Sequence, residues 1–125
     1  MSHVTKLKLK ISNFTCLQDA LKRITGAAFL GKTTVDYFNK RQHGIAFQLP
    51  SFVYPIVVNP ETYELYADMY GGKWGDQKEL DKLMQHYAVE CTKSFAENND
   101  YYYEEQTNEN GEIRCTLTSK DAYYA

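Results

Sequence analysis

The sequence predicts an α+β domain of two layers, in which a mainly antiparallel sheet carries a short N-terminal helix and one long helix, about residues 77–97, on one face. Several short segments alternate apolar and polar side chains with a period of two, which is typical of strands with one wet face. Residues 80–95 instead repeat their apolar side chains with a helical period. The order of elements is strand, helix, several strands, long helix and two strands, which favours helices gathered on one side of a sheet.

Length and composition indicate a single globular domain, which we place at residues 1–119, with a frayed tail at 120–125. The formal charge of −2 argues against bulk attraction to nucleic acid or anionic membrane, although it leaves room for a local basic stripe. The three cysteines (Cys16, Cys91 and Cys115) lack a C-x-x-C spacing, which favours reduced thiols in the cytoplasm. We expect no secretory signal and no membrane span.

The first strand and the first helix are the clearest elements of the N-terminal part. Apolar side chains at 7, 9 and 11 alternate with Lys6, Lys8 and Lys10, so one strand face is basic and wet. A short helix is expected to begin with Thr15 as its cap, paired with Gln18 in a capping box. Its apolar stripe is formed by Leu17, Ala20, Leu21 and Ile24, and Gly26 is the expected stop.

The middle of the chain predicts further strands with less definition. Residues 29–30 or 33–38 are alternative strands, residues 41–44 are interpreted as a turn, and residues 45–49 alternate again. Two apolar rows, 52–58 and 63–69, then predict a hairpin with a four-residue loop at 59–62. That loop pairs Val58 with Tyr63, Ile56 with Leu65 and Tyr54 with Ala67, so that apolar side chains meet.

The long helix is expected to start at Asp76, with Glu79 at capping-box spacing, and to lay one apolar face on the sheet. That face consists of Leu80, Leu83, Met84, Tyr87, Ala88, Cys91 and Phe95.

A final hairpin follows, for which two turns compete. A two-residue loop at Asn110 and Gly111 would set apolar side chains opposite polar ones. A three-residue loop at 109–111 is preferred, because it pairs Leu117 with Tyr103 and puts Gly111 at the left-handed position.

Two glycine-containing segments are candidates for anion binding. Residues 26–33 match the phosphate-loop pattern G-x-x-x-x-G-K-S/T, but a helix precedes them and β-prone residues follow, so we interpret the match at Lys32 as chance. The segment 70–76 instead leaves a strand and enters a helix, so Gly71, Gly72 and Lys73 could bind an anion. Asp76 would repel that anion, and a flexible connection with a packed Trp74 is the competing interpretation.

Other features point to binding surfaces more than to chemistry. The lysine row of the first strand could follow nucleic-acid phosphates with Tyr102 as a stacking platform, or it could simply be solvated or protect a sheet edge. Tyr101, Tyr102 and Tyr103 put aromatic side chains on both sides of a late strand, where they suit protein contacts or edge covering.

Catalytic and metal-binding patterns are missing from the sequence. The histidines His3, His43 and His86 have no ligand spacing, and His86 falls on the polar side of the long helix. We find no nucleophile elbow and no cysteine beside a histidine, so we name no catalytic residue, metal ligand or cofactor and lean against an enzyme.

Several segments together resemble an uncharacterised family of cyanobacteria and red-algal plastids called hypothetical chloroplast reading frame thirty-five. They are Met1-Ser2-His3 with the lysine strand, residues 63–68 leading into Gly71, residues 83–88 and residues 111–117. Residues 69–70 and 26–52 depart from the family pattern, as in a divergent member such as one carried by a phage. The resemblance implies one domain in the cytoplasm or plastid stroma, and it implies no reaction.

The leading functional hypothesis is a non-catalytic protein-interaction module that binds an unidentified protein through Trp74, Tyr70 and Tyr102. One alternative is a nucleotide or phosphate-ligand domain that uses the 70–76 loop. A second and weaker alternative is nucleic-acid binding through the lysine strand.

Overall fold

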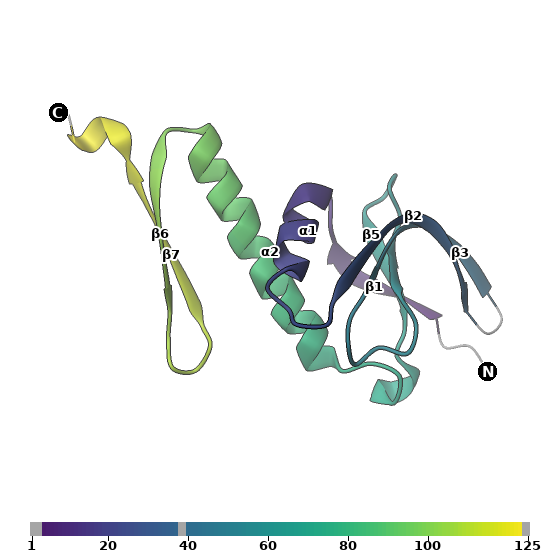
Figure 1. Cartoon of the computed structure of the whole chain (residues 1–125). Coiled ribbons are helices and arrows are strands. Elements are labelled where there is room, and N and C mark those ends of the chain that lie inside the picture. The colour runs from purple at the N-terminus through teal and green to yellow at the C-terminus, as the bar shows by residue number, and fades with distance from the viewer. Residues whose placement is uncertain (1–3, 38–39, 124–125) are drawn as a thin grey trace.

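A computed structural model describes residues 4–37 and 40–123 and confirms the α+β fold class (Figure 1). A five-stranded antiparallel sheet has the order β1-β5-β4-β3-β2, and β6 and β7 form a separate hairpin. The elements are β1 (Val4–Lys10), α1 (Phe14–Leu21), β2 (Ala28–Tyr37), β3 (Lys40–Gln48), β4 (Ile56–Val58), β5 (Glu64–Asp68), η1 (Tyr70–Gly72), α2 (Gln77–Asn98), β6 (Tyr101–Thr107), β7 (Ile113–Ser119) and η2 (Lys120–Tyr123).

The main core lies between the five-stranded sheet and the two helices. Leu17 of α1, Leu65 of β5 and Leu80 of α2 are completely buried there. Each such side chain stabilises the fold by roughly 1.5–3 kcal/mol. The alternation seen in the sequence therefore does set which strand face meets the helices.

Both helix starts use a side-chain cap, and one cap differs from the prediction. Asn13, not Thr15, caps α1, because its extended backbone places Oδ1 3.0 Å from the amide nitrogen of Cys16. Asp76 caps α2 as predicted and accepts from the Lys78 amide at 2.9 Å. Glu79 does not close a capping box; it accepts from the Ser51 amide at 2.9 Å and so ties α2 to the loop before β4.

The least defined stretch of the sequence is a long hairpin, β2–β3. The predicted turn at residues 41–44 is wrong, because these residues lie within β3 and pair with residues 33–36 of β2. The connection at 38–39 lies outside the described residues. The Tyr37 hydroxyl lies 2.6 Å from the carbonyl oxygen of Pro55, so the end of β2 reaches over the outer sheet face. A small second core forms there from Val35, Tyr37, Ala46 and Val57.

The β4–β5 register also differs from the prediction. Val58 pairs with Leu65 and not with Tyr63. Tyr63 has φ 65° and its amide donates to the Asn59 carbonyl at 2.7 Å, so it belongs to the turn and shifts the pairing by two residues. A shift of two keeps every side chain on its predicted face, which is why the apolar pattern does not reveal it.

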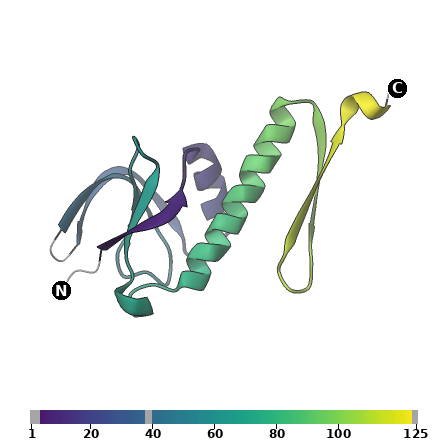
Figure 2. The same cartoon turned by 180° about the vertical axis from the view of Figure 1, so that it is seen from behind.

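The long helix extends past the sheet that it is predicted to cover. Leu80 and Leu83 enter the main core, but Ala88 is exposed and the Phe95 side chain is 53% exposed. Val89 and Ala96 are buried instead, and they lie about 160–180° around the helix from Leu80. Figures 1 and 2 show the β6–β7 hairpin on that side of α2, away from the sheet. The helix α2 therefore packs against two layers, the five-stranded sheet and the β6–β7 hairpin, and not against one.

The final hairpin confirms the three-residue turn. Tyr103 pairs with Leu117, Glu105 with Cys115, and Gly111 has φ +87°. Lys120, the first residue of the predicted tail, begins η2, and its amide donates to the Asp100 carbonyl at 3.1 Å. Residues 124–125 lie outside the described residues.

A close backbone approach between β3 and β4 supplies a test of this fold. A Cβ at Gly44, which has φ +157°, would clash with the carbonyl oxygen of Val58. We expect Gly44→Ala to lower the free energy of unfolding by about 3 kcal/mol, because the obstacle is backbone and cannot rotate away.

Gly111→Ala is the matched control for this substitution. Nothing lies within 4 Å of a Cβ at Gly111, so only its left-handed backbone should cost stability, by about 1–2 kcal/mol. Urea unfolding measures both variants. An equal loss in the two would contradict the close packing of β3 on β4.

Candidate functional site

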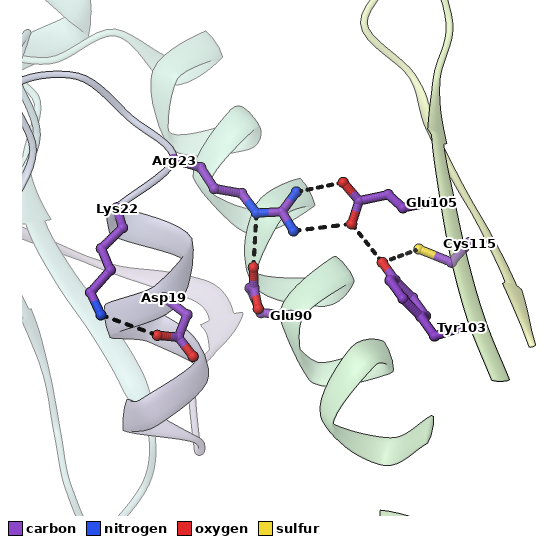
Figure 3. A network of polar contacts seen from close by, with 7 residues as sticks. All are labelled: Asp19, Lys22, Arg23, Glu90, Tyr103, Glu105 and Cys115. Atoms are coloured by element: carbon purple, nitrogen blue, oxygen red, sulfur yellow. Dashed lines mark hydrogen bonds and ion pairs between the residues drawn. The ribbon is translucent and has the colours of Figure 1, made fainter. Parts of the chain in front are cut away.

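One arginine joins three elements at the place where the hairpin meets the helices (Figure 3). Arg23 follows α1, and its Nε donates to Glu90 of α2 at 2.8 Å. Its two terminal nitrogens donate to the two carboxylate oxygens of Glu105 in β6, at 2.9 and 3.0 Å. The Tyr103 hydroxyl donates to Glu105 at 2.7 Å and lies 3.4 Å from Cys115 Sγ. This bidentate pair fixes the orientation of the hairpin as well as its position.

The electrostatics of the network favour the charged carboxylate. The hydrogen bonds from Arg23, followed by that from Tyr103, lower the pKa of Glu105 to about 2. Burial, with hydrogen bonds to Cys115 and Glu105, raises the pKa of Tyr103 well above its ordinary value, so its hydroxyl stays a donor. These contacts have no signal in the sequence, because Arg23 is 67 and 82 residues from its two partners.

His86 lies beside this network, and its position corrects the sequence interpretation. It is not on a freely exposed polar side: its ring is partly covered, and its Nδ1 is buried without a hydrogen-bond partner among the described residues. Burial lowers the pKa of His86, and the nearby Arg23 and Lys82 lower it further, while Glu105 and Glu90 act against them. The folded arrangement around α2 therefore favours the neutral form of the His86 ring.

The hairpin itself is only partly covered. Its helix-facing apolar and aromatic side chains are half-buried, and none is fully buried: Tyr101, Tyr103, Ile113, Cys115 and Leu117. Phe95 stacks on Tyr101 with ring centroids 6.0 Å apart, although half of the Phe95 side chain stays exposed. Within the described residues β6 and β7 pair only with each other, so each strand presents one open edge.

The predicted partner-binding residues do not form one site. Trp74 stacks on Tyr70 with ring centroids 4.5 Å apart, so these two residues lie together. Tyr102 is 43% exposed on the hairpin, where the Lys120 ammonium lies 5.3 Å from its ring centroid. The 22 residues of α2, a length of about 33 Å, separate the two regions in the fold.

In the loop at residues 70–76, which the sequence predicts to bind an anion, most backbone amides already donate hydrogen bonds within the protein. Gly72 and Trp74 donate to the Met69 carbonyl at 2.9 Å, and Lys73 donates to Tyr70 at 3.0 Å. Asp76 occupies the start of α2. An anion near Gly71, Gly72 and Lys73 would therefore depend on the Lys73 ammonium, which lies 5.1 Å from the Tyr70 ring centroid.

The phosphate-loop match at residues 26–33 has the wrong structure for that function. Lys32 and Thr33 lie inside β2 and pair with Ile45 and Gly44, and no helix follows them directly. They instead line a groove of about 510 Å³ between the β2–β3 hairpin and the loop after β4, together with His43 and Glu61 among others. Glu61 adds a negative charge to the lining that Lys32 shares, which does not favour a phosphate.

Neither a metal-binding cluster nor a membrane-spanning helix is present in residues 4–37 and 40–123, a range that excludes His3. In that part of the chain no group of three or more His, Cys, Asp or Glu is placed to hold a metal ion. No described helix combines the length and the apolar character needed to cross a bilayer.

Comparison with family models, with curated proteins and with solved structures gives no match to this chain.

The Arg23 network leads to a test of hairpin docking. Arg23→Gln removes the bidentate pair and leaves two carboxylates partly buried, so we expect the hairpin to open more easily, by about 1.5–3 kcal/mol. Hydrogen exchange of the β6 and β7 amides measures this opening. Lys22→Gln is the control, because its 79% exposed side chain pairs with Asp19 at 3.5 Å and should change exchange by less than about 0.5 kcal/mol. Equal protection in both variants would show that Arg23 does not hold the hairpin.

Acid should loosen the same contact in two stages. The pKa of His86 is below 6.5 in the folded chain, so the ring is neutral in both states and costs no stability well above that pH. As the pH falls below 6.5, protonation favours the unfolded chain and the free energy of unfolding declines. The pKa of Glu105 is about 2 against an ordinary 4.5, so the charged carboxylate stabilises the fold at neutral pH. This part of the free energy of unfolding is lost as the pH falls from 4.5 toward 2. We expect urea midpoints to fall over both ranges, His86→Gln to remove the upper stage and Glu105→Gln the lower. A midpoint constant from neutral pH to about pH 3 would contradict this assignment.

Proposed function

We propose that the chain is a non-catalytic protein-interaction module whose principal contact surface is the β6–β7 hairpin. The observation that supports this most directly is the incomplete cover of the hairpin: half-buried apolar side chains on its helix side, with an open edge on each strand. A two-stranded hairpin is marginally stable alone, and a third strand would satisfy its free edge groups. An extended partner segment that adds to the hairpin fits this need.

The charge of this part of the chain indicates the chemistry of the partner. Residues 76–125 contain 11 acidic and five basic residues, and Glu109 and Glu112 lie in and directly after the turn of the hairpin. Glu104, on the side of β6 away from α2, is exposed beside Tyr102. A partner segment rich in lysine or arginine, with an aromatic or apolar residue to contact Tyr102, is the complement of this surface.

The Tyr70–Trp74 pair remains a proposed contact of its own, at the other end of α2. Because it is separated from Tyr102, it would meet a different segment or a different partner. Phosphate-ligand binding through Lys73 remains the alternative for this loop, and nucleotide stabilisation of the chain in a thermal-shift assay would support it.

We propose a compartment and a family for the chain as well. The three cysteines are free, and Cys16 is buried, which suits a reducing compartment such as the cytoplasm or the plastid stroma. Membership of the plastid and cyanobacterial family named above would agree with that location and would add no activity.

Co-purification from native lysate, followed by direct binding of the recovered protein in purified form, tests the interaction. We expect Tyr102→Ala combined with Glu104→Lys to weaken binding at least about tenfold while the melting temperature stays within a few degrees, because both side chains are exposed. The control is Tyr63→Ala combined with Glu61→Lys, an equivalent exposed pair in the loop after β4. A purified partner bound equally by both double variants would contradict the hairpin assignment.

A further inference from the structure

We propose that the outer face of the five-stranded sheet binds single-stranded nucleic acid, with the lysines of β1 on the phosphates and the rings of Tyr66, Tyr70 and Trp74 against the bases. This face is a different surface from the hairpin, so its binding does not depend on the hairpin contact. Three features of the molecule support the assignment: a lysine row, a linked set of aromatic rings beside it, and the division of charge along the chain.

The lysine row is built by the alternation of β1. Leu7 and Leu9 pack against the main core, so Lys6, Lys8 and Lys10 lie on the opposite face, and all three are exposed. The pairing of β1 with β5 shifts between Leu7 and Lys10, so a bulge interrupts the row: Lys6 pairs with Tyr66, whereas Lys10 pairs with Glu64. β1 is an edge strand, so a chain of phosphates has open access to the row. Lys6 forms an ion pair with Glu64 at 3.3 Å, and its side chain is still 57% exposed.

Aromatic rings with lysines next to them continue this face. Lys6 pairs across the ladder with Tyr66, and the Lys40 ammonium lies 5.8 Å from the centroid of the Tyr66 ring. Four residues further on, Tyr70 stacks on Trp74, and Lys73 lies over Tyr70. Tyr66, Tyr70 and Trp74 are each partly buried, so bases would contact the part of each ring that stays accessible beside the lysines. Aromatic rings interleaved with cations are the usual construction of a single-strand binding surface.

These rings are held in place from beneath. Trp74 meets Tyr54 edge to face with centroids 5.6 Å apart, and Tyr54 meets Tyr37 at the same separation. The Tyr37 hydroxyl lies 3.3 Å from the Tyr66 carbonyl oxygen, so the inner rings connect the two outer positions. Positions fixed in advance reduce the ordering that a flexible ligand imposes on the protein.

The net charge of the chain hides a strong division. Residues 1–75 contain nine basic and five acidic residues, whereas residues 76–125 contain five basic and 11 acidic. The sheet half is therefore the positive one, and a polyanion would be attracted to it and repelled by the hairpin half. Tyr102, the stacking platform expected from the sequence, lies on the acidic hairpin and is replaced in this role by Tyr66.

The position of Trp74 makes a direct assay available, because it is the single tryptophan of the sequence. We expect a single-stranded deoxythymidine oligomer of about 12 nucleotides to quench its fluorescence, with an affinity that falls as salt rises. Lys6→Gln combined with Lys8→Gln should weaken binding about tenfold and lower the salt slope by about 1.4. Tyr66→Leu should weaken binding by at least about fivefold with an unchanged slope, because stacking is not ionic.

Lys78→Gln combined with Lys82→Gln is the matched control, since these lysines are also exposed but lie on α2. It should leave affinity and slope unchanged. Three outcomes would overturn the proposal: no quenching at low salt, equal weakening by the α2 variant, or equally tight binding of polyglutamate, which would make the face a site for acidic protein. Loss of oligomer binding would leave the hairpin contact untouched, and the hairpin double variant should bind the oligomer normally.

Discussion

The structure depends on a helix that is longer than the sheet beside it. The 22 residues of α2 span about 33 Å, whereas the five residues of β5 span about 17 Å. Leu80 and Leu83 are held by the sheet, but the C-terminal half needs cover from elsewhere. The β6–β7 hairpin and α1 supply it, and Arg23, just after α1, pairs with Glu90 of α2 and with Glu105 of β6. The position of the hairpin therefore depends on one partly buried guanidinium and its two carboxylates, together with the Phe95–Tyr101 stack and the hydrogen bond that Gln85 donates to the Gly111 carbonyl.

This arrangement gives the two halves of the molecule different physical character. The sheet half has a core of fully buried side chains between strands and helices, together with a second small core under Tyr37. The hairpin half has half-buried side chains and a charged hydrogen-bond network, so its local opening should be easier than that of the sheet. Regions of low local stability are where binding can most readily reorganise a protein, which agrees with a contact role for the hairpin.

The two proposed contact surfaces divide along the same line. The acidic hairpin presents open strand edges, and the basic sheet face presents lysines between aromatic rings. The helix α2 lies between the hairpin and the five-stranded sheet, so ligands on both surfaces could be held at a set separation without competing. A chain with both surfaces in use would bring a protein close to a nucleic-acid strand. Holding two ligands close together in this way requires no chemical reaction by the chain.

The sequence by itself determined the fold class, the faces of β1, the cap and length of α2 and the turn at Gly111, because each follows from side-chain periodicity or from a local backbone requirement. It also brought Tyr70 and Trp74 together, since they are four residues apart. Only the tertiary structure decided which face of α2 meets the hairpin, because Val89 and Ala96 are too few to show a second stripe. The same holds for the Arg23 network and for the separation of Tyr102 from Trp74, since contacts between residues so far apart in sequence leave no periodic signal. The register of β4 on β5 is also decided by the tertiary structure. A slip of two residues at Tyr63 preserves the alternation of apolar and polar side chains, so packing and not the sequence pattern selects which residues pair.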